Sequence, residues 1–113
     1  MSAQPRSRLS HVDEAIEISR NKALLSIQRA LWDKVTPNLR GVALGWHESV
    51  TARFIYAEPI SDEIRDLVSE AETEVVADFP SDTHVMFTTE YLPAAERRAM
   101  TDAEWWANLR REP

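Results

Sequence analysis

The chain has 113 residues, of which 43% are hydrophobic and 28% charged, and its formal net charge is −6. This length and composition predict one globular domain over residues 10–113, preceded by a flexible polar tail over residues 1–9. The chain has no cysteine and two glycines, which excludes disulfides, thiolate zinc sites and glycine-rich phosphate loops. Because no long apolar run or secretory signal is present, we expect a cytoplasmic protein without a membrane partner.

The first predicted element is an amphipathic helix that ends before Pro37. Apolar residues recur at three- and four-residue spacing between Ile16 and Val35, which is typical of a helix with one buried face. Both Ser10 and Asn21 fit the N-cap, so two starting points remain open. The end is better defined, because proline disfavours helical backbone at the residue before it.

Two strands are predicted next, over residues 40–46 and 50–58, joined by a short turn as a hairpin. In the first strand, large apolar side chains alternate with glycine and alanine. One face of the strand therefore carries the large side chains, and the other face, called the small face, carries only glycine and alanine. Phe54 and Tyr56 are expected to share the core face with the large residues. The small face would allow another segment to approach the sheet closely.

A second helix is predicted to begin at Ser61, its N-cap, and to end at Pro80. Its apolar residues follow the helical stripe closely. A third strand is then predicted over residues 83–91, because large apolar residues again alternate with polar ones.

The last predicted element has two interpretations. Thr101 and Glu104 have capping-box spacing, which predicts a helix over residues 102–110. Tryptophan favours strands, however, and Trp105 and Trp106 would fit a fourth strand that pairs with the third. The predicted fold class is α+β: a small antiparallel sheet of three or four strands with two helices packed on one face, in the order α-β-β-α-β followed by a strand or a helix.

The charge is concentrated in the middle of the chain. Residues 41–92 carry eleven carboxylates and two arginines, a net charge of 2 − 11 = −9, whereas residues 1–40 carry +3 and residues 93–113 are neutral. A concentrated acidic field attracts cationic partners and repels nucleic acid. We therefore expect a cationic protein partner and no nucleic acid.

Four carboxylates of the second helix fall on one flank of its apolar stripe, and we call them the acidic ridge: Glu63, Asp66, Glu70 and Glu74. Like charges four residues apart destabilise an isolated helix by about 0.2–0.5 kcal/mol per pair, and no lysine is interleaved. The ridge is predicted to bind the partner, and its alternative interpretation is a solvated acidic face. Glu74 lies at the edge of the stripe and also fits a structural ion pair with Arg40 or Arg53.

The four tryptophans are the other candidate binding residues. Trp32 and Trp46 fit the core of the predicted fold. Trp105 and Trp106 are adjacent and cannot face the same side of a strand, so one of them is expected to be exposed. Trp106 is therefore predicted, with the acidic ridge, to contact the partner.

No motif indicates catalysis, a metal or a cofactor. The three histidines are scattered and have no metal-ligand spacing, and no serine lies in a nucleophile motif. We expect a protein that is not an enzyme and that holds no cofactor. A small enzyme based on His47 and His84 remains as an alternative.

Several short segments are similar to a known group of proteins: Pro37-Asn-Leu-Arg-Gly-Val-Ala-Leu, Ala52-Arg-Phe-Ile-Tyr, Ile60-Ser-Asp-Glu, Thr73-Glu-Val-Val-Ala-Asp-Phe and Leu109-Arg-Arg-Glu. Together, over residues 30–112, they resemble small bacterial immunity proteins encoded beside polymorphic toxins, including those of contact-dependent growth inhibition systems. The resemblance implies an antitoxin-type partner that neutralises a toxin domain, with no catalytic residues.

The leading hypothesis is thus an immunity protein that blocks a basic toxin domain, with a nuclease as first candidate, through the acidic ridge and the neighbouring sheet edge. The alternative is a self-associating interaction domain, such as a homodimer, that uses a sheet edge and the tryptophan pair.

Overall fold

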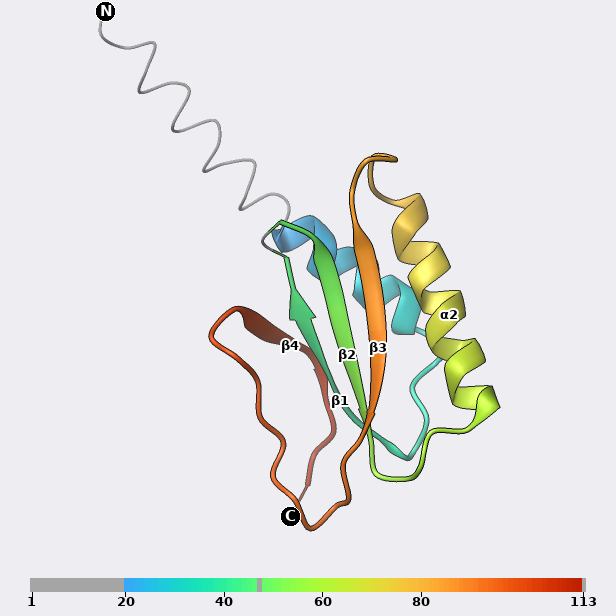
Figure 1. Ribbon diagram of the computed structural model, residues 1–113, viewed down its shortest axis with the longest axis vertical. Helices are drawn as coiled ribbons and strands as arrows, with labels where there is room; N and C mark the ends of the chain where they lie inside the picture. Colours follow the sequence, from blue (N-terminus) through green and yellow to red (C-terminus); the bar gives the residue numbers. More distant parts are fainter. Residues whose placement is uncertain (1–19, 47, 113) are drawn as a thin grey trace, which may run out of the picture.

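The computed structural model describes residues 20–46 and 48–112. They form one sheet with two helices on one side of it (Figure 1). The strands are β1 (Leu39–Gly45), β2 (Val50–Tyr56), β3 (Val85–Tyr91) and β4 (Glu104–Leu109), and the second helix is α2 (Asp62–Ala77). The first helix covers residues 20–31 of the described part. The predicted α+β class is confirmed, and the last element is a strand.

The first helix is already helical at Arg20, so Asn21 lies within it and is not its N-cap. The other predicted start, Ser10, and the predicted tail over residues 1–9 lie outside the described residues. For α2 the predicted cap is confirmed: the hydroxyl of Ser61 accepts a hydrogen bond from the backbone N–H of Ile64, at 3.2 Å.

The sheet is mixed, and its strand order is β3-β2-β1-β4. β1 pairs antiparallel with β2 and with β4, whereas β2 and β3 are parallel. The predicted all-antiparallel sheet is therefore wrong for β3, because α2 carries the chain back to the starting end of β2, as a βαβ crossover does. The predicted pairing of the last strand with the third is also wrong. The loop over residues 92–103 instead takes the chain along the sheet to the far edge (Figure 1).

The hydrophobic core lies between the sheet and the two helices. Apolar residues of the first helix, α2 and the first three strands form one buried cluster: Ala23, Ile27, Ala30, Leu31, Leu39, Val42, Leu44, Val50, Ala52, Phe54, Tyr56, Ile64, Val68, Ala71, Val75 and Phe87. Phe54 and Tyr56 share this core with the large residues of β1, as predicted. The rings of Phe54 and Phe87 pack with their centroids 5.5 Å apart, which links β2 to β3.

The opposite face of the sheet is also covered, although neither of the two described helices packs on it. Ala43 and Ile55 are buried but do not belong to the helix-side core. The ring of Trp106 lies over Gly41: a Cβ built on this glycine would be 2.9 Å from Trp106 Cζ3. The small face of β1 therefore admits a close neighbour, as its glycine and alanine residues predict.

The two edges of the sheet differ. At the β3 edge, the carboxylate of Glu72 in α2 accepts a hydrogen bond from the backbone N–H of Phe87, at 2.8 Å. The β4 edge carries Trp105, which is 54% exposed, and Leu109, which is 49% exposed. An edge strand with large apolar residues is a surface on which another strand can pair.

We expect the Gly41→Ala variant to be destabilised by about 1–3 kcal/mol, because the added methyl group overpacks the contact with the Trp106 ring. Urea denaturation measures this loss. In the Trp106→Leu background the same substitution should cost much less, since the crowded ring is absent. An equal loss in the free energy of unfolding in both backgrounds would show that the Trp106 ring does not crowd the added methyl group.

Candidate functional site

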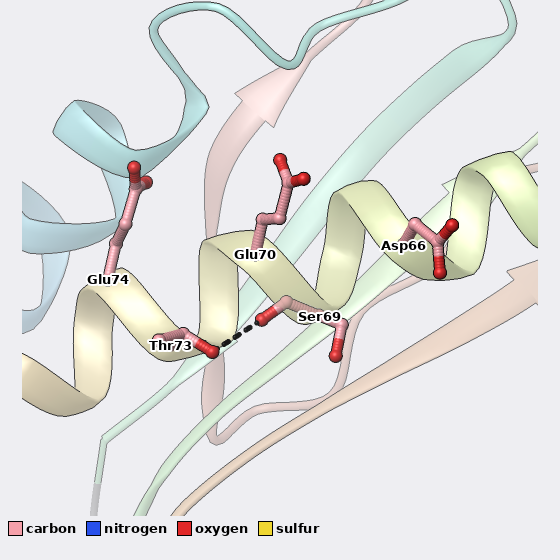
Figure 2. Close-up of a pocket in the computed structure, with 5 residues that line it drawn as sticks. All are labelled: Asp66, Ser69, Glu70, Thr73 and Glu74. Carbon is pink, nitrogen blue, oxygen red and sulfur yellow. Dashed lines mark hydrogen bonds between the residues drawn. The ribbon is translucent and has the colours of Figure 1, made fainter.

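The acidic ridge is an exposed, largely unneutralised row of carboxylates on α2. Figure 2 shows Asp66, Glu70 and Glu74 following one another along the helix, around an open hollow that Ser69 and Thr73 also line. Within residues 20–46 and 48–112, no ion pair involves Glu63, Asp66 or Glu70. Such a row produces a local negative potential that solvent and salt screen only partly at short range.

Glu74 differs from the rest of the ridge because it has a cationic partner. Lys34 donates hydrogen bonds from Nζ to Glu74 and to Asp33, each at 3.0 Å. The predicted pairing of Glu74 with Arg40 or Arg53 is wrong, since both arginines bind other carboxylates. Lys34 was missed, although it lies three residues after the buried Leu31 and so continues the inward face of the first helix.

The Lys34 side chain is 6% exposed, whereas the Glu74 side chain is 53% exposed. Burial opposes the charged form of Lys34, but hydrogen bonds to Glu74 and Asp33 outweigh it, and the pKa of Lys34 is raised. Lys34 therefore stays cationic and offsets charge at the C-terminal end of the ridge. The unbalanced charge is at Glu63, Asp66 and Glu70.

Arg53 holds the loop over residues 92–103 against the sheet face opposite the two described helices. It donates two hydrogen bonds to Glu104, at 2.9 Å each, one to Glu90 at 2.7 Å and one to the backbone carbonyl of Ala99 at 2.8 Å. The hydrogen bonds with Glu104 are the main reason that the pKa of Arg53 is raised. These acids are therefore structural.

Arg40 fixes the C-terminal segment. Its side chain is 1% exposed, and its guanidinium donates two hydrogen bonds to Glu112, at 2.8 and 3.0 Å. It also donates to the carbonyls of Leu92, Pro93 and Glu96. The hydrogen bonds from Arg40 are the main cause that lowers the pKa of Glu112 to about 2.

One of the four tryptophans, Trp32, is placed differently from its predicted position. Trp32 is 90% exposed, so its predicted place in the core is wrong. Trp32 follows Leu31, the last helical residue, and is not part of the side of the helix that faces the core. Trp46 is partly buried and packs against the core. Trp105 is exposed and Trp106 partly buried, in line with the expectation that one of the pair is exposed.

The structure does not bring Trp106 together with the acidic ridge. The Trp106 ring lies over Gly41, on the sheet face away from the helices, whereas the ridge lies on α2. The two predicted parts of the site therefore belong to different surfaces.

Across the described ranges 20–46 and 48–112, no group of histidine, aspartate and glutamate side chains is arranged to hold a metal ion. In the same part of the chain, no helix combines the length and apolar character that crossing a bilayer requires. Of the two histidines of the enzyme alternative, His84 is exposed and His47 lies outside the described residues.

We expect the Glu112→Gln variant to lower the unfolding temperature by on the order of 10 °C, because the buried Arg40 loses its carboxylate partner. The pKa of Glu112 in the folded protein, about 2, is below its ordinary value of 4.5. The unfolded chain therefore takes up this proton first, so the stabilisation is complete above pH 4.5 and is lost as the pH falls towards 2.

Thermal unfolding of both proteins between pH 7 and pH 2 tests this prediction. The difference between wild type and Glu112→Gln should shrink across the acid range. Glu63→Gln is the matched control, since Glu63 is exposed and has no ion pair among the described residues. A difference that stays constant with pH would contradict the assigned role of the Glu112 carboxylate.

Comparisons with known proteins identify the family. No curated protein matches the chain. A family model described as MafI2 immunity protein matches residues 20–112, which is 93 of the 113 residues. The match covers every helix and strand described above, including β4 and the C-terminal Glu112. The chain therefore belongs to the MafI2 immunity protein family.

Proposed function

We propose that this protein is a cytoplasmic immunity protein that binds a basic toxin domain through the acidic ridge and blocks it without catalysis. Membership of an immunity protein family supports the toxin as partner. The observation that carries the finer proposal is the row of three carboxylates, Glu63, Asp66 and Glu70, without ion-pair partners in the described structure. A row of this kind complements a cationic surface.

A nuclease is the first candidate for the toxin. An enzyme that binds nucleic acid must carry a cationic surface to neutralise phosphates. The ridge presents carboxylates at a rise of about 6 Å for each four residues along the helix. An acidic helix on that surface would compete with the phosphate backbone for the same arginine and lysine side chains.

Two further residues have distinct roles in this proposal. Glu74 contributes less than its neighbours, because Lys34 already offsets its charge. Trp106 belongs to a second contact, because it lies on the other face of the sheet. Complementary charge should accelerate encounter and sharpen specificity more than it increases affinity.

The triple variant Glu63→Lys, Asp66→Lys and Glu70→Lys tests the ridge. We expect its association rate with the cognate toxin domain to fall at least about tenfold at low ionic strength. The dependence of that rate on salt should flatten as well. Surface plasmon resonance at several salt concentrations measures both quantities.

The matched control reverses three exposed loop acids, Glu48, Glu58 and Asp82, and so has the same net charge. It should retain most of the wild-type association rate. An equal loss of association rate in the two triple variants would show that only net charge matters. A wild-type salt dependence in the ridge variant would refute the role of the ridge in binding.

Self-association through β4 is the second candidate function, because this edge strand exposes Trp105 and Leu109. In such a homodimer the β4 strands of two copies would pair. Trp105→Glu should then convert the dimer to a monomer in sedimentation velocity. A wild-type protein that sediments as a monomer up to about 100 μM, well above ordinary dimer dissociation constants, would remove this candidate.

A further inference from the structure

We infer that residues 93–112, which we call the C-terminal strap, open as one cooperative unit while β1, β2, β3 and both described helices stay folded. The strap consists of the loop that follows β3, of β4 and of the last described residues. Its hinge is Leu92, whose backbone N–H pairs with the carbonyl of Tyr56 on β2, at 2.8 Å. Opening uncovers the outer edge of β1 and the guanidinium of Arg40. The acidic ridge on α2 stays in place, so the inference is independent of the proposed function.

The hydrophobic core is complete without the strap. In Figure 1 the strap, in orange to red, lies at the side of the sheet away from α2. Every described residue of the buried cluster lies between Ala23 and Phe87, and no residue of the strap is buried. The apolar contacts described for the strap are marginal: Ala107 packs at the edge of the core, and the Trp106 ring lies over Gly41. Because apolar burial is the main driving force of folding, opening the strap removes little of it.

The strap is attached mainly by arginine side chains. Arg40 donates two hydrogen bonds to the Glu112 carboxylate and two more to backbone carbonyls of the loop. Arg53 donates two to Glu104 and one to the carbonyl of Ala99. Water replaces these protein partners when the strap opens, so the net contribution of each hydrogen bond to stability is modest. The strap is therefore held less strongly than the apolar core.

Two arginines of the strap link its parts to one another and to β1. Arg98 donates to the carbonyl of Arg40, at 2.7 Å, and to the carbonyl of Arg110, at 2.6 Å. The backbone N–H of Arg110 also donates to the Arg40 carbonyl, at 3.0 Å, and its side chain donates to the carbonyl of Pro37, at 2.6 Å. The loop, the end of β4 and the last residues thus meet at Arg40. Loss of one contact weakens the others, which makes opening cooperative.

The loop part of the strap does not fill the space above the sheet. A cavity of about 300 Å³ remains there, lined by Arg53, Ile55 and Glu90 of the sheet and by Arg97, Ala99 and Met100 of the strap. Atoms that face a cavity lose packing contacts on that side. This incomplete packing lowers the cost of lifting the strap from the sheet.

Amide hydrogen exchange of the folded wild-type protein, followed by NMR, tests the inference. We expect the amide of Arg110 and the β4 amides that are bonded to β1 to have protection factors at least about 30-fold below those of β2. The reason is that the strap amides exchange in the open state, whereas β2 exchanges on global unfolding. Equal protection in the strap and in β2 would contradict the inference.

A core variant separates opening of the strap from unfolding of the core. Ile27→Val removes a methyl group from the first helix, where Ile27 is 0% exposed. It should lower the protection of β2 about fivefold and leave that of Arg110 unchanged, because the core contacts persist in the open state. A common decrease at Arg110 and in β2 would show that the strap opens only with the whole protein, which would overturn the inference.

Glu104→Gln tests whether the strap opens as one unit. Arg53 binds Glu104 at the beginning of β4, and Arg110 lies just beyond the end of this strand. The variant should lower the protection of the Arg110 amide at least about fivefold, because a weaker attachment at Glu104 favours opening of the whole strap. Glu63→Gln is the matched control, since Glu63 is exposed on α2 and has no ion pair among the described residues, and it should leave this amide unchanged. An Arg110 amide that does not respond to Glu104→Gln would show independent fraying and would refute cooperative opening.

Discussion

The guanidinium of Arg40 lies inside the protein, and the arrangement of the C-terminal third depends on satisfying it. A buried charge is costly unless its hydrogen bonds and its counter-charge are both supplied. β1 places Arg40 between two segments that are far away in the sequence, and these supply Glu112 and the carbonyls of Leu92, Pro93 and Glu96. The loop after β3 and the segment after β4 are thereby held in place around one side chain.

The buried and partly buried basic side chains also determine which carboxylates of the molecule are neutralised. Arg40 and Arg53 bind acids of β3, of β4 and of the C-terminal segment. Lys34 offsets the acid at one end of α2. Glu63, Asp66 and Glu70, which have no ion-pair partner among the described residues, lie together on the exposed side of α2. Part of the negative charge of residues 41–92 is therefore gathered on one helix surface, and this locality gives it value for recognition.

Local elements were predictable because their signals lie within a few residues. The alternation in β1 and β2, the N-cap at Ser61 and the stripe of α2 each depend on spacing alone. The pairing of β1 with β2 as a hairpin was predictable for the same reason. The partners of β3 and β4 were not, because neither the crossover through α2 nor residues 92–103 indicate in the sequence which edge the chain reaches. The position of the ridge followed from helical geometry. The partner of Glu74 and the exposure of Trp32 depend on where the first helix ends and how it packs, which periodicity does not determine.

The hydrogen bond from the backbone N–H of Phe87 to Glu72 makes the two edges of the sheet unequal in their ability to accept a further strand. The carboxylate occupies the place that a carbonyl of a neighbouring strand would take. A strand added at this edge would have to displace the Glu72 carboxylate from the N–H of Phe87. This cost favours β4 over β3 as the edge through which two copies of the protein would pair, and pairing through one edge gives closed dimers.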